Sequence, residues 1–310
     1  PVMHIAIVGA GGIGGYFGAR WIQAGARVSF IARGAHGAEI RVHGLRVTSA
    51  LGDATVRPHH VSADPADIGA ADIVVFAVKL PDAEEAAAKL KPLLRPGTVV
   101  LPLQNGVDVV DMLAREVGAS AVAVGVAQIS ARIGSPGVIE HVGPLARVRF
   151  GPLQPNQADA MQALHALCQK AKVEADLLAD PRRAVWEKFV FLVGLSSLTA
   201  LTRQPVGVVR EHPEMRRLLR QVMAETAALA RAEGMALDEA FVDAQMAGAD
   251  RLPPHVKASM LGDLQAGKPL ELPWLAGAVV RRSEQHGLNA DANRFVAAAL
   301  APYVHGAPKA

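Results

Sequence analysis

Residues 4–33, HIAIVGAGGIGGYFGARWIQAGARVSFIAR, decide the fold of this 310-residue chain. The short apolar run at 5–8 predicts a buried strand, and it leads directly into a cluster of glycines. The pattern at 15–24 predicts a helix, and the β-branched and aromatic residues at 28–31 predict a second strand. A strand, a glycine-rich turn, a helix and a second strand together indicate the opening of a parallel α/β fold.

The glycine-rich turn has the spacing G-x-G-x-x-G at the junction of strand and helix. The first glycine permits a tight turn, the second lets the backbone approach a pyrophosphate, and the third allows close packing of helix on strand. The N-terminus of the helix faces the phosphate charge. A glycine-rich turn can be merely structural, but the flanking elements favour dinucleotide binding. The residues expected to bind it are Gly9, Ala10, Gly11, Gly12, Ile13 and Gly14.

The end of the second strand indicates which dinucleotide binds. An NAD site usually has Asp or Glu there, hydrogen-bonded to the ribose 2′-hydroxyl. This chain has no carboxylate before Glu39, and Arg33 stands at the strand end. A guanidinium can bind a 2′-phosphate through two parallel hydrogen bonds. Arg33 could instead be a solvated surface arginine, yet the missing acid argues against NAD in either case. We therefore expect NADP or NADPH as the cofactor.

The rest of the chain predicts two domains. Residues 1–179 alternate strand and helix patterns, ending with glycine-punctuated β segments at 130–150 and a further helix and strand. After Asp180, the pattern of apolar and polar residues is almost entirely that of helices. The fold class is thus α/β, with a Rossmann-type doubly wound parallel sheet in an NADP-binding domain at 1–179. An all-helical second domain follows at 180–310. Beyond residue 33, the first domain is expected to have strands at 73–78, 98–101, 121–126 and 173–175, and helices at 82–90, 107–116 and 156–172. In the second domain, helices are expected at 183–201, 213–233, 237–246, 256–265 and 272–287.

Composition excludes several classes of protein. Hydrophobic residues make up 51% and charged residues 20%, and the formal net charge is +3. The basic residues are scattered, so we expect no nucleic acid as a partner. No uninterrupted apolar stretch reaches the ~18 residues of a membrane span, and the N-terminus lacks the pattern of a signal peptide. The single cysteine, Cys168, predicts a packed core thiol and a cytoplasmic protein. We expect no metal ion, and the helical domain is compatible with a homodimer.

Further motifs resemble one known family. Val78-Lys79 follows the third core strand, and Leu103-Gln104-Asn105-Gly106-Val107 forms an asparagine-glycine turn. The sequence at 186–189, WEKF, and the segments SMLGDL at 259–264 and GKPLE at 267–271 come next. In this order and spacing, they resemble the ketopantoate reductase (2-dehydropantoate 2-reductase) family over nearly the whole chain. The resemblance implies NADPH-dependent reduction of ketopantoate to pantoate, on the route to pantothenate and coenzyme A.

The resemblance also implies that the helical domain at 180–310 binds the substrate and carries the catalytic residues, and it gives individual residues their roles. Lys188 would be the general acid, and Glu271 would orient the substrate and the lysine. Ser259 would contact the substrate carboxylate, with Asp263 supporting the site. Asn105 would lie where the nicotinamide ribose and the substrate meet. Lys79 would lie nearby, at the carboxyl edge where α/β sheets bind ligands.

Each of these residues also has a simpler interpretation. Lys188 lies on an apolar helix, where an idle ammonium would be costly, but its stem could extend along the helix rim. Ser259 and Asp263 share one helix face and could simply be solvent-exposed polar residues. Glu271 could be an exposed carboxylate, and Asn105 with the following glycine could be a plain turn.

The chain departs from the family pattern beside the lysine. Many members carry asparagines four and eight residues after it, contacting the hydroxyl and carbonyl region of the substrate. This chain has Leu192 and Ser196 there. Losing one such contact costs roughly 1–3 kcal/mol, so the departure affects the choice of substrate. The alternatives are therefore a reductase of a more apolar 2-oxo acid, a non-catalytic NADP-binding regulatory protein, or a different dehydrogenase with a helical second domain.

Overall fold

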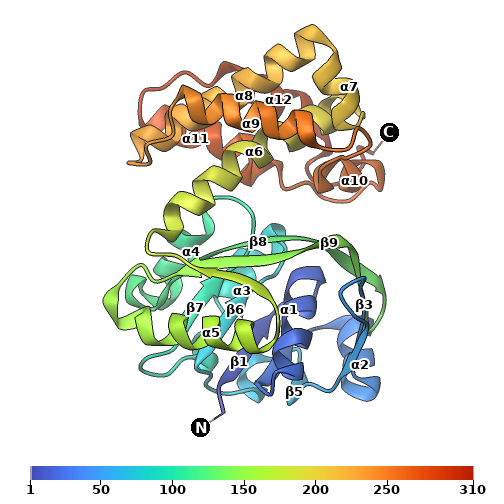
Figure 1. Cartoon of the computed structure of the whole chain (residues 1–310), viewed down its shortest axis with the longest axis vertical. Coiled ribbons are helices and arrows are strands. Elements are labelled where there is room, and N and C mark those ends of the chain that lie inside the picture. Colours follow the sequence, from blue (N-terminus) through green and yellow to red (C-terminus); the bar gives the residue numbers. More distant parts are fainter. Residues whose placement is uncertain (1, 310) are drawn as a thin grey trace. The chain divides into compact units, whose positions relative to one another are not determined.

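The computed structural model describes residues 2–309, which form two compact units. The first, called here the sheet unit, extends to Gln104 and resumes from Val109 to Ala184. The second, the helical unit, contains Asn105–Asp108 and the chain from Val185 onward. The division falls inside a helix that begins at Pro181, whereas the sequence predicts a boundary at 179/180. In Figure 1, the sheet unit is drawn mainly in blue to green and the helical unit in yellow to red.

The sheet unit is built of short strands and helices. In chain order they are β1 (His4–Val8), α1 (Gly12–Gln23), β2 (Arg27–Ile31), α2 (Gly34–His43), β3 (Leu45–Thr48), β4 (Ala54–Val56), β5 (His60–Ser62), β6 (Ile73–Phe76), α3 (Leu80–Ala87), β7 (Val99–Pro102), α4 (Val109–Val117), β8 (Val124–Ser135), β9 (Val138–Gly151), α5 (Ala158–Lys170) and β10 (Glu174–Leu177).

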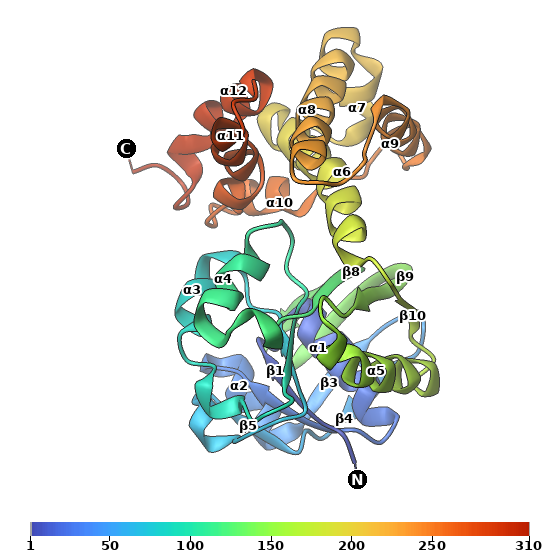
Figure 2. The same ribbon diagram turned by 90° about the vertical axis from the view of Figure 1, so that its left-hand side faces the viewer.

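The first sheet is parallel and has the strand order β5-β2-β1-β6-β7. Ile5 and Ile7 of β1 pack on the α1 side, whereas Ala6 and Val8 join the cluster formed with α3 and α4. Both faces are therefore buried, as in doubly wound folds. Figure 2 shows α3 and α4 on one side of the sheet unit and α5 with β10 on the other. This arrangement confirms the predicted Rossmann-type sheet.

A second sheet covers α1 from the other side. Its order is β10-β9-β3-β4, and β8 pairs with β9 in a long antiparallel hairpin. A Cβ on Gly15 would meet the Ile139 side chain of β9, and one on Gly18 would meet Phe30 of β2. The helix is thus held between the two sheets by close approach at its glycines. The antiparallel segment expected at 130–150 is confirmed, since β8 and β9 span it.

Some predicted elements were wrong or absent. The predicted strand at 121–126 is not a full strand of the parallel sheet, because only Val122 bridges to Val100 before β8 leaves for the second sheet. An apolar run has the same sequence pattern in either sheet, so the sequence does not indicate which strand it pairs with. Helix α2 and the short strands β3, β4 and β5 were not predicted from the sequence.

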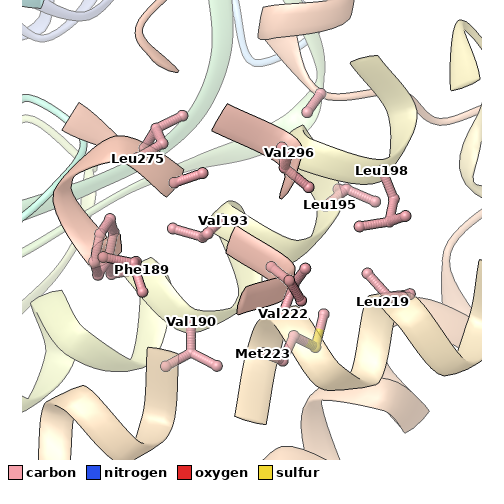
Figure 3. Packing of buried hydrophobic residues seen from close by; sticks show 14 of the residues in the cluster. Phe189, Val190, Val193, Leu195, Leu198, Leu219, Val222, Met223, Leu275 and Val296 are labelled. Atoms are coloured by element: carbon pink, nitrogen blue, oxygen red, sulfur yellow. The ribbon is translucent and has the colours of Figure 1, made fainter. Parts of the chain in front are cut away.

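The helical unit is one bundle around its own core. Its helices are α6 (Pro181–Thr202), α7 (Val206–Glu211), α8 (Pro213–Ala232), α9 (Glu239–Arg251), α10 (Ser259–Gln265), α11 (Ala276–Gln285) and α12 (Asp291–Leu300). Figure 3 shows side chains of α6 meeting those of α8, with Val296 of α12 beside them. Among the described residues, only α6 has the length and apolarity of a membrane span, and its apolar window is mostly buried in the bundle. This is the pattern of a core helix.

Candidate active site

The glycine turn lies at the carboxyl end of β1, the central strand of the parallel sheet. Gly9 has φ +101°, and a Cβ there would touch the backbone of Ala77. A Cβ on Gly12 would overlap the Ala131 carbonyl of β8, and one on Gly14 would overlap the Gly9 carbonyl. Gly11 differs, because a Cβ there meets nothing within 4 Å. The structure therefore requires three of these glycines for its own packing, and it leaves open space in front of Gly11.

A histidine that sequence reasoning missed holds this turn in place. His36 of α2 accepts a hydrogen bond from the Gly137 N–H at its Nδ1 (2.9 Å). Its other nitrogen, Nε2, therefore carries the proton and donates to the Ala10 carbonyl at 2.6 Å. The ring joins α2, the β8–β9 hairpin and the glycine turn. No periodicity or motif marks His36, since the contact depends on three separate segments.

Arg33 is the N-cap residue of α2, two residues after β2, and it has a partner that the sequence did not suggest. Its Nη2 lies 3.2 Å from the Oδ2 of Asp82, in the first turn of α3. Both side chains are largely exposed. Lys79 is the exposed N-cap residue of α3, which follows β6. These residues stand at the carboxyl edge of the sheet, on both sides of the glycine turn.

A buried amide at the same edge lacks partners within the protein. Gln104 follows β7, and neither Oε1 nor Nε2 of its side chain has a hydrogen-bond partner among the described residues. Leaving such a group unpaired costs about 1–3 kcal/mol. An orphaned amide at the carboxyl edge of an α/β sheet is the arrangement expected where a ligand completes the hydrogen bonds. The sequence motif contained Gln104, but its neighbour Asn105 was singled out instead.

In the helical unit, the structure brings Lys188 and Asn105 together. Lys188 of α6 donates from Nζ to Asn105 Oδ1 at 2.9 Å. The lysine keeps some exposed area, yet enough protein surrounds the ammonium for burial to lower its pKa to about 8. The negative charge of Glu271 acts in the opposite direction and raises that pKa. Lys188, Asn105 and Glu271 thus form one electrostatic cluster.

The segment 105–108 is fixed by a clamp of charges. Asp108 pairs with Arg281, and it accepts a hydrogen bond from Nε of Arg282 at 2.8 Å. Arg282 also binds Glu233 at 2.7 Å, and its other nitrogen donates to the Val107 carbonyl. The side chain of Val107 joins the core of the bundle. This clamp anchors the short segment that carries Asn105.

The other predicted substrate residues lie along α6 and α10. Leu192 and Ser196 are one and two turns after Lys188, and they share its helix stripe. Leu192 packs against the core, whereas Ser196 is buried with no hydrogen-bond partner for its Oγ among the described residues. Ser259 is the exposed first residue of α10, and Asp263 lies one turn later, half-buried.

A dinucleotide fits the residues of the sheet unit. The first N–H groups of a helix have no intrahelical partners, and α1 presents them beside the open space at Gly11. Arg33 is a cation at the strand end, and the Gln104 amide can still form hydrogen bonds with a ligand. Within residues 2–309, no group of His, Cys, Asp or Glu is placed to hold a metal ion.

The fold and these residues define the chain as an oxidoreductase with a Rossmann-type sheet. More particularly, it belongs to the ketopantoate reductase PanE/ApbA family. The N-terminal model of that family matches residues 5–155, and its C-terminal model matches residues 180–304. The resemblance stated from the motifs is therefore confirmed.

Individual relatives agree with this assignment. A 2-dehydropantoate 2-reductase of Halobacterium salinarum is 32% identical, covering 92% of this chain and 94% of its own. An uncharacterized oxidoreductase of Bacillus subtilis is 26% identical, with coverage of 97% and 99%. A PanE/ApbA family ketopantoate reductase from Ralstonia eutropha superposes with a TM-score of 0.87, at 32% identity and coverage of 97% and 98%. D-mandelate dehydrogenase, solved with NADH, shares the fold at 20% identity and a TM-score of 0.88, with coverage of 97% and 98%.

Proposed function

We propose that this protein reduces a 2-oxo acid with NADPH, and that ketopantoate, giving pantoate, is the leading substrate. The family and its curated 2-dehydropantoate 2-reductases support the class of reaction. The single observation that carries the proposal is the buried Lys188, whose lowered pKa and hydrogen bond to Asn105 suit it to proton donation.

The chemistry requires a hydride at the carbonyl carbon and a proton at the carbonyl oxygen. A bound dihydronicotinamide supplies the hydride. Lys188 is the cation that stabilises negative charge on the oxygen and donates the proton to it. Asn105 accepts a hydrogen bond from the ammonium and so fixes the orientation of the Lys188 side chain. Glu271 limits the depression of the lysine pKa, which keeps the ammonium protonated near neutral pH.

A second candidate is the same reaction on a more apolar 2-oxo acid. Leu192 is partly exposed, one turn from Lys188 on the same stripe of α6. An isobutyl group at that position cannot hydrogen-bond a substrate hydroxyl. A site that lacks such a bond discriminates poorly between a substrate and its deoxy analogue.

The test is NADPH oxidation with two acids that differ only in one hydroxyl, ketopantoate and 3,3-dimethyl-2-oxobutanoate. If ketopantoate is the substrate, its kcat/KM exceeds that of the deoxy analogue by roughly 10-fold or more. Equal or reversed values exclude ketopantoate specificity and leave the apolar 2-oxo acid.

The panel also distinguishes an enzyme from a binding protein. Tight NADPH binding without turnover of any 2-oxo acid, straight-chain acids included, would contradict the proposal and indicate a non-catalytic NADP-binding regulator.

A further inference from the structure

The ion pair between Arg33 and Asp82 spans the glycine turn. Arg33 follows β2 and Asp82 follows β6, while β1 lies between these two strands. Adjacent strands are about 4.8 Å apart, so the ends of β2 and β6 are separated by roughly 10 Å. A pair with 3.2 Å between Nη2 and Oδ2 therefore connects both sides of the turn that leads into α1.

This pair is weak enough to open for a ligand. The side chains of Arg33 and Asp82 are 70% and 48% exposed, and exposed pairs contribute about 0–1 kcal/mol. An anion that needs the Arg33 guanidinium must compete with the Asp82 carboxylate for it. Once bound, the anion would lie near a like charge that α3 holds in place.

The two possible cofactors respond to Asp82 in opposite ways. The 2′-phosphate of NADPH is attracted by Arg33 and repelled by Asp82. The ribose 2′-hydroxyl of NADH carries no charge and can donate to a carboxylate, which is the usual role of an acid in NAD sites. The end of β2 has no acid, but the fold brings one there from α3.

We propose that Asp82 is a specificity-determining residue that lowers the preference of this protein for NADPH over NADH. The inference rests on the proposed function, in which Arg33 binds the 2′-phosphate. Glu85 also feels the charge of Arg33, but its carboxylate pairs with Lys89 at 3.1 Å. Asp82 is therefore the carboxylate that faces the guanidinium directly.

The experiment measures binding of two cofactor fragments by calorimetry, adenosine 2′,5′-bisphosphate and 5′-ADP. Asp82→Asn keeps the shape of the side chain and removes its charge. We expect its affinity for the bisphosphate to rise about 5- to 20-fold at low salt, with little change for 5′-ADP. The gain should shrink as ionic strength increases. Glu84→Gln, an exposed carboxylate on the same helix, is the control and should change neither affinity appreciably.

Two further variants make the outcomes distinguishable. Asp82→Asn should have a much smaller effect in an Arg33→Ala background, because the competition for the guanidinium is then absent. Unchanged bisphosphate affinity in Asp82→Asn, while Arg33→Ala weakens it, would overturn the role of Asp82 and leave NADPH use intact. If the wild-type protein does not prefer the bisphosphate to 5′-ADP and Asp82→Asn does not create a preference, both the role of Asp82 and the proposed NADPH selectivity fail.

Discussion

Lys188 has a depressed pKa, and this depression predicts how activity depends on pH. Burial lowers the pKa from the ordinary value of 10.5 to about 8. The ammonium is the acid in the proposed reaction, so kcat/KM for reduction should be highest below that value and fall as pH rises through about 8. The measurement is kcat/KM for NADPH-dependent reduction between pH 6 and 10.

Two substitutions test whether Lys188 causes this fall in kcat/KM near pH 8, which is called the alkaline limb of the pH profile. Lys188→Met should lower kcat by roughly 10²–10⁴-fold with little change in NADPH affinity. Lys188→Arg keeps a positive charge that does not titrate in this range, so any residual activity should lose the limb near pH 8. A Met variant with near-normal turnover, or an Arg variant that keeps the limb, would remove Lys188 from its proposed role.

The lowered pKa of Lys188 also changes how the stability of the folded chain depends on pH. In the unfolded chain Lys188 binds its proton up to about pH 10.5, whereas in the folded chain it releases the proton near 8. Between these values the unfolded state binds more protons, so the contribution of this group to stability rises with pH. Below about pH 8 the buried ammonium destabilises the fold, which is consistent with a residue kept for chemistry.

The glycine turn offers a second prediction at the residue scale. Gly11 has φ −76° and open space where a Cβ would be, so Gly11→Ala should leave the free energy of unfolding nearly unchanged. It should nevertheless weaken NADPH binding, because the methyl group occupies the space where the pyrophosphate would approach the backbone. Denaturant unfolding and fluorescence titration with NADPH measure the two effects.

Gly12→Ala is the matched control for this experiment. Its methyl group would overlap the Ala131 carbonyl, a backbone atom that cannot move aside cheaply. We expect a loss of stability of roughly 1–3 kcal/mol or more. Unimpaired NADPH binding by Gly11→Ala would show that the open space is not the pyrophosphate site.

At the scale of elements, the clamp between the 105–108 segment and α11 predicts a coupling between stability and turnover. Asp108→Ala removes the partner of Arg281 and a carboxylate that also binds Arg282. We expect the free energy of unfolding to fall by roughly 1–3 kcal/mol. We also expect kcat to fall and the limb near pH 8 to shift, since Asn105 is no longer fixed against Lys188, while NADPH affinity stays the same.

The control for this prediction is Glu284→Ala, which removes an exposed ion pair with Arg294 on the same bundle. It should change stability by less than about 0.5 kcal/mol and leave the pH profile unaltered. If Asp108→Ala destabilises the protein but leaves kcat and the pH limb as in the wild type, the clamp is structural only.

The sequence predicted those elements that carry a strong local signal. The glycine turn, the alternating strands and the long apolar α6 each follow from residues close together in the chain, and the structure has all of them. The short strands β3 to β5 escaped prediction because three or four residues carry too little periodicity. The helix expected at 272–287 begins instead at Ala276, after a short 3-10 turn that contains Pro273.

At the scale of the whole molecule, some residues of the site could be predicted from sequence motifs and others could not. Lys188 and Asn105 were both named from their motifs, and the structure joins them by a hydrogen bond. His36, Asp82 and Arg282 were not named, because each acts through a partner far away in the sequence. Such pairs depend on tertiary structure, which local sequence patterns do not reveal.

The chain enters the helical unit for four residues at Asn105 and leaves it again until Val185, and this has a consequence for biosynthesis. Asp108 is synthesised 174 residues before Arg282, an interval of about 10–35 s at ribosomal elongation rates of roughly 5–20 residues per second. The sheet unit can assemble around its glycine turn in that time, whereas the clamp on Asn105 must wait for α11. A nascent or prematurely terminated chain would therefore acquire the ability to bind a dinucleotide before it acquires an ordered proton donor.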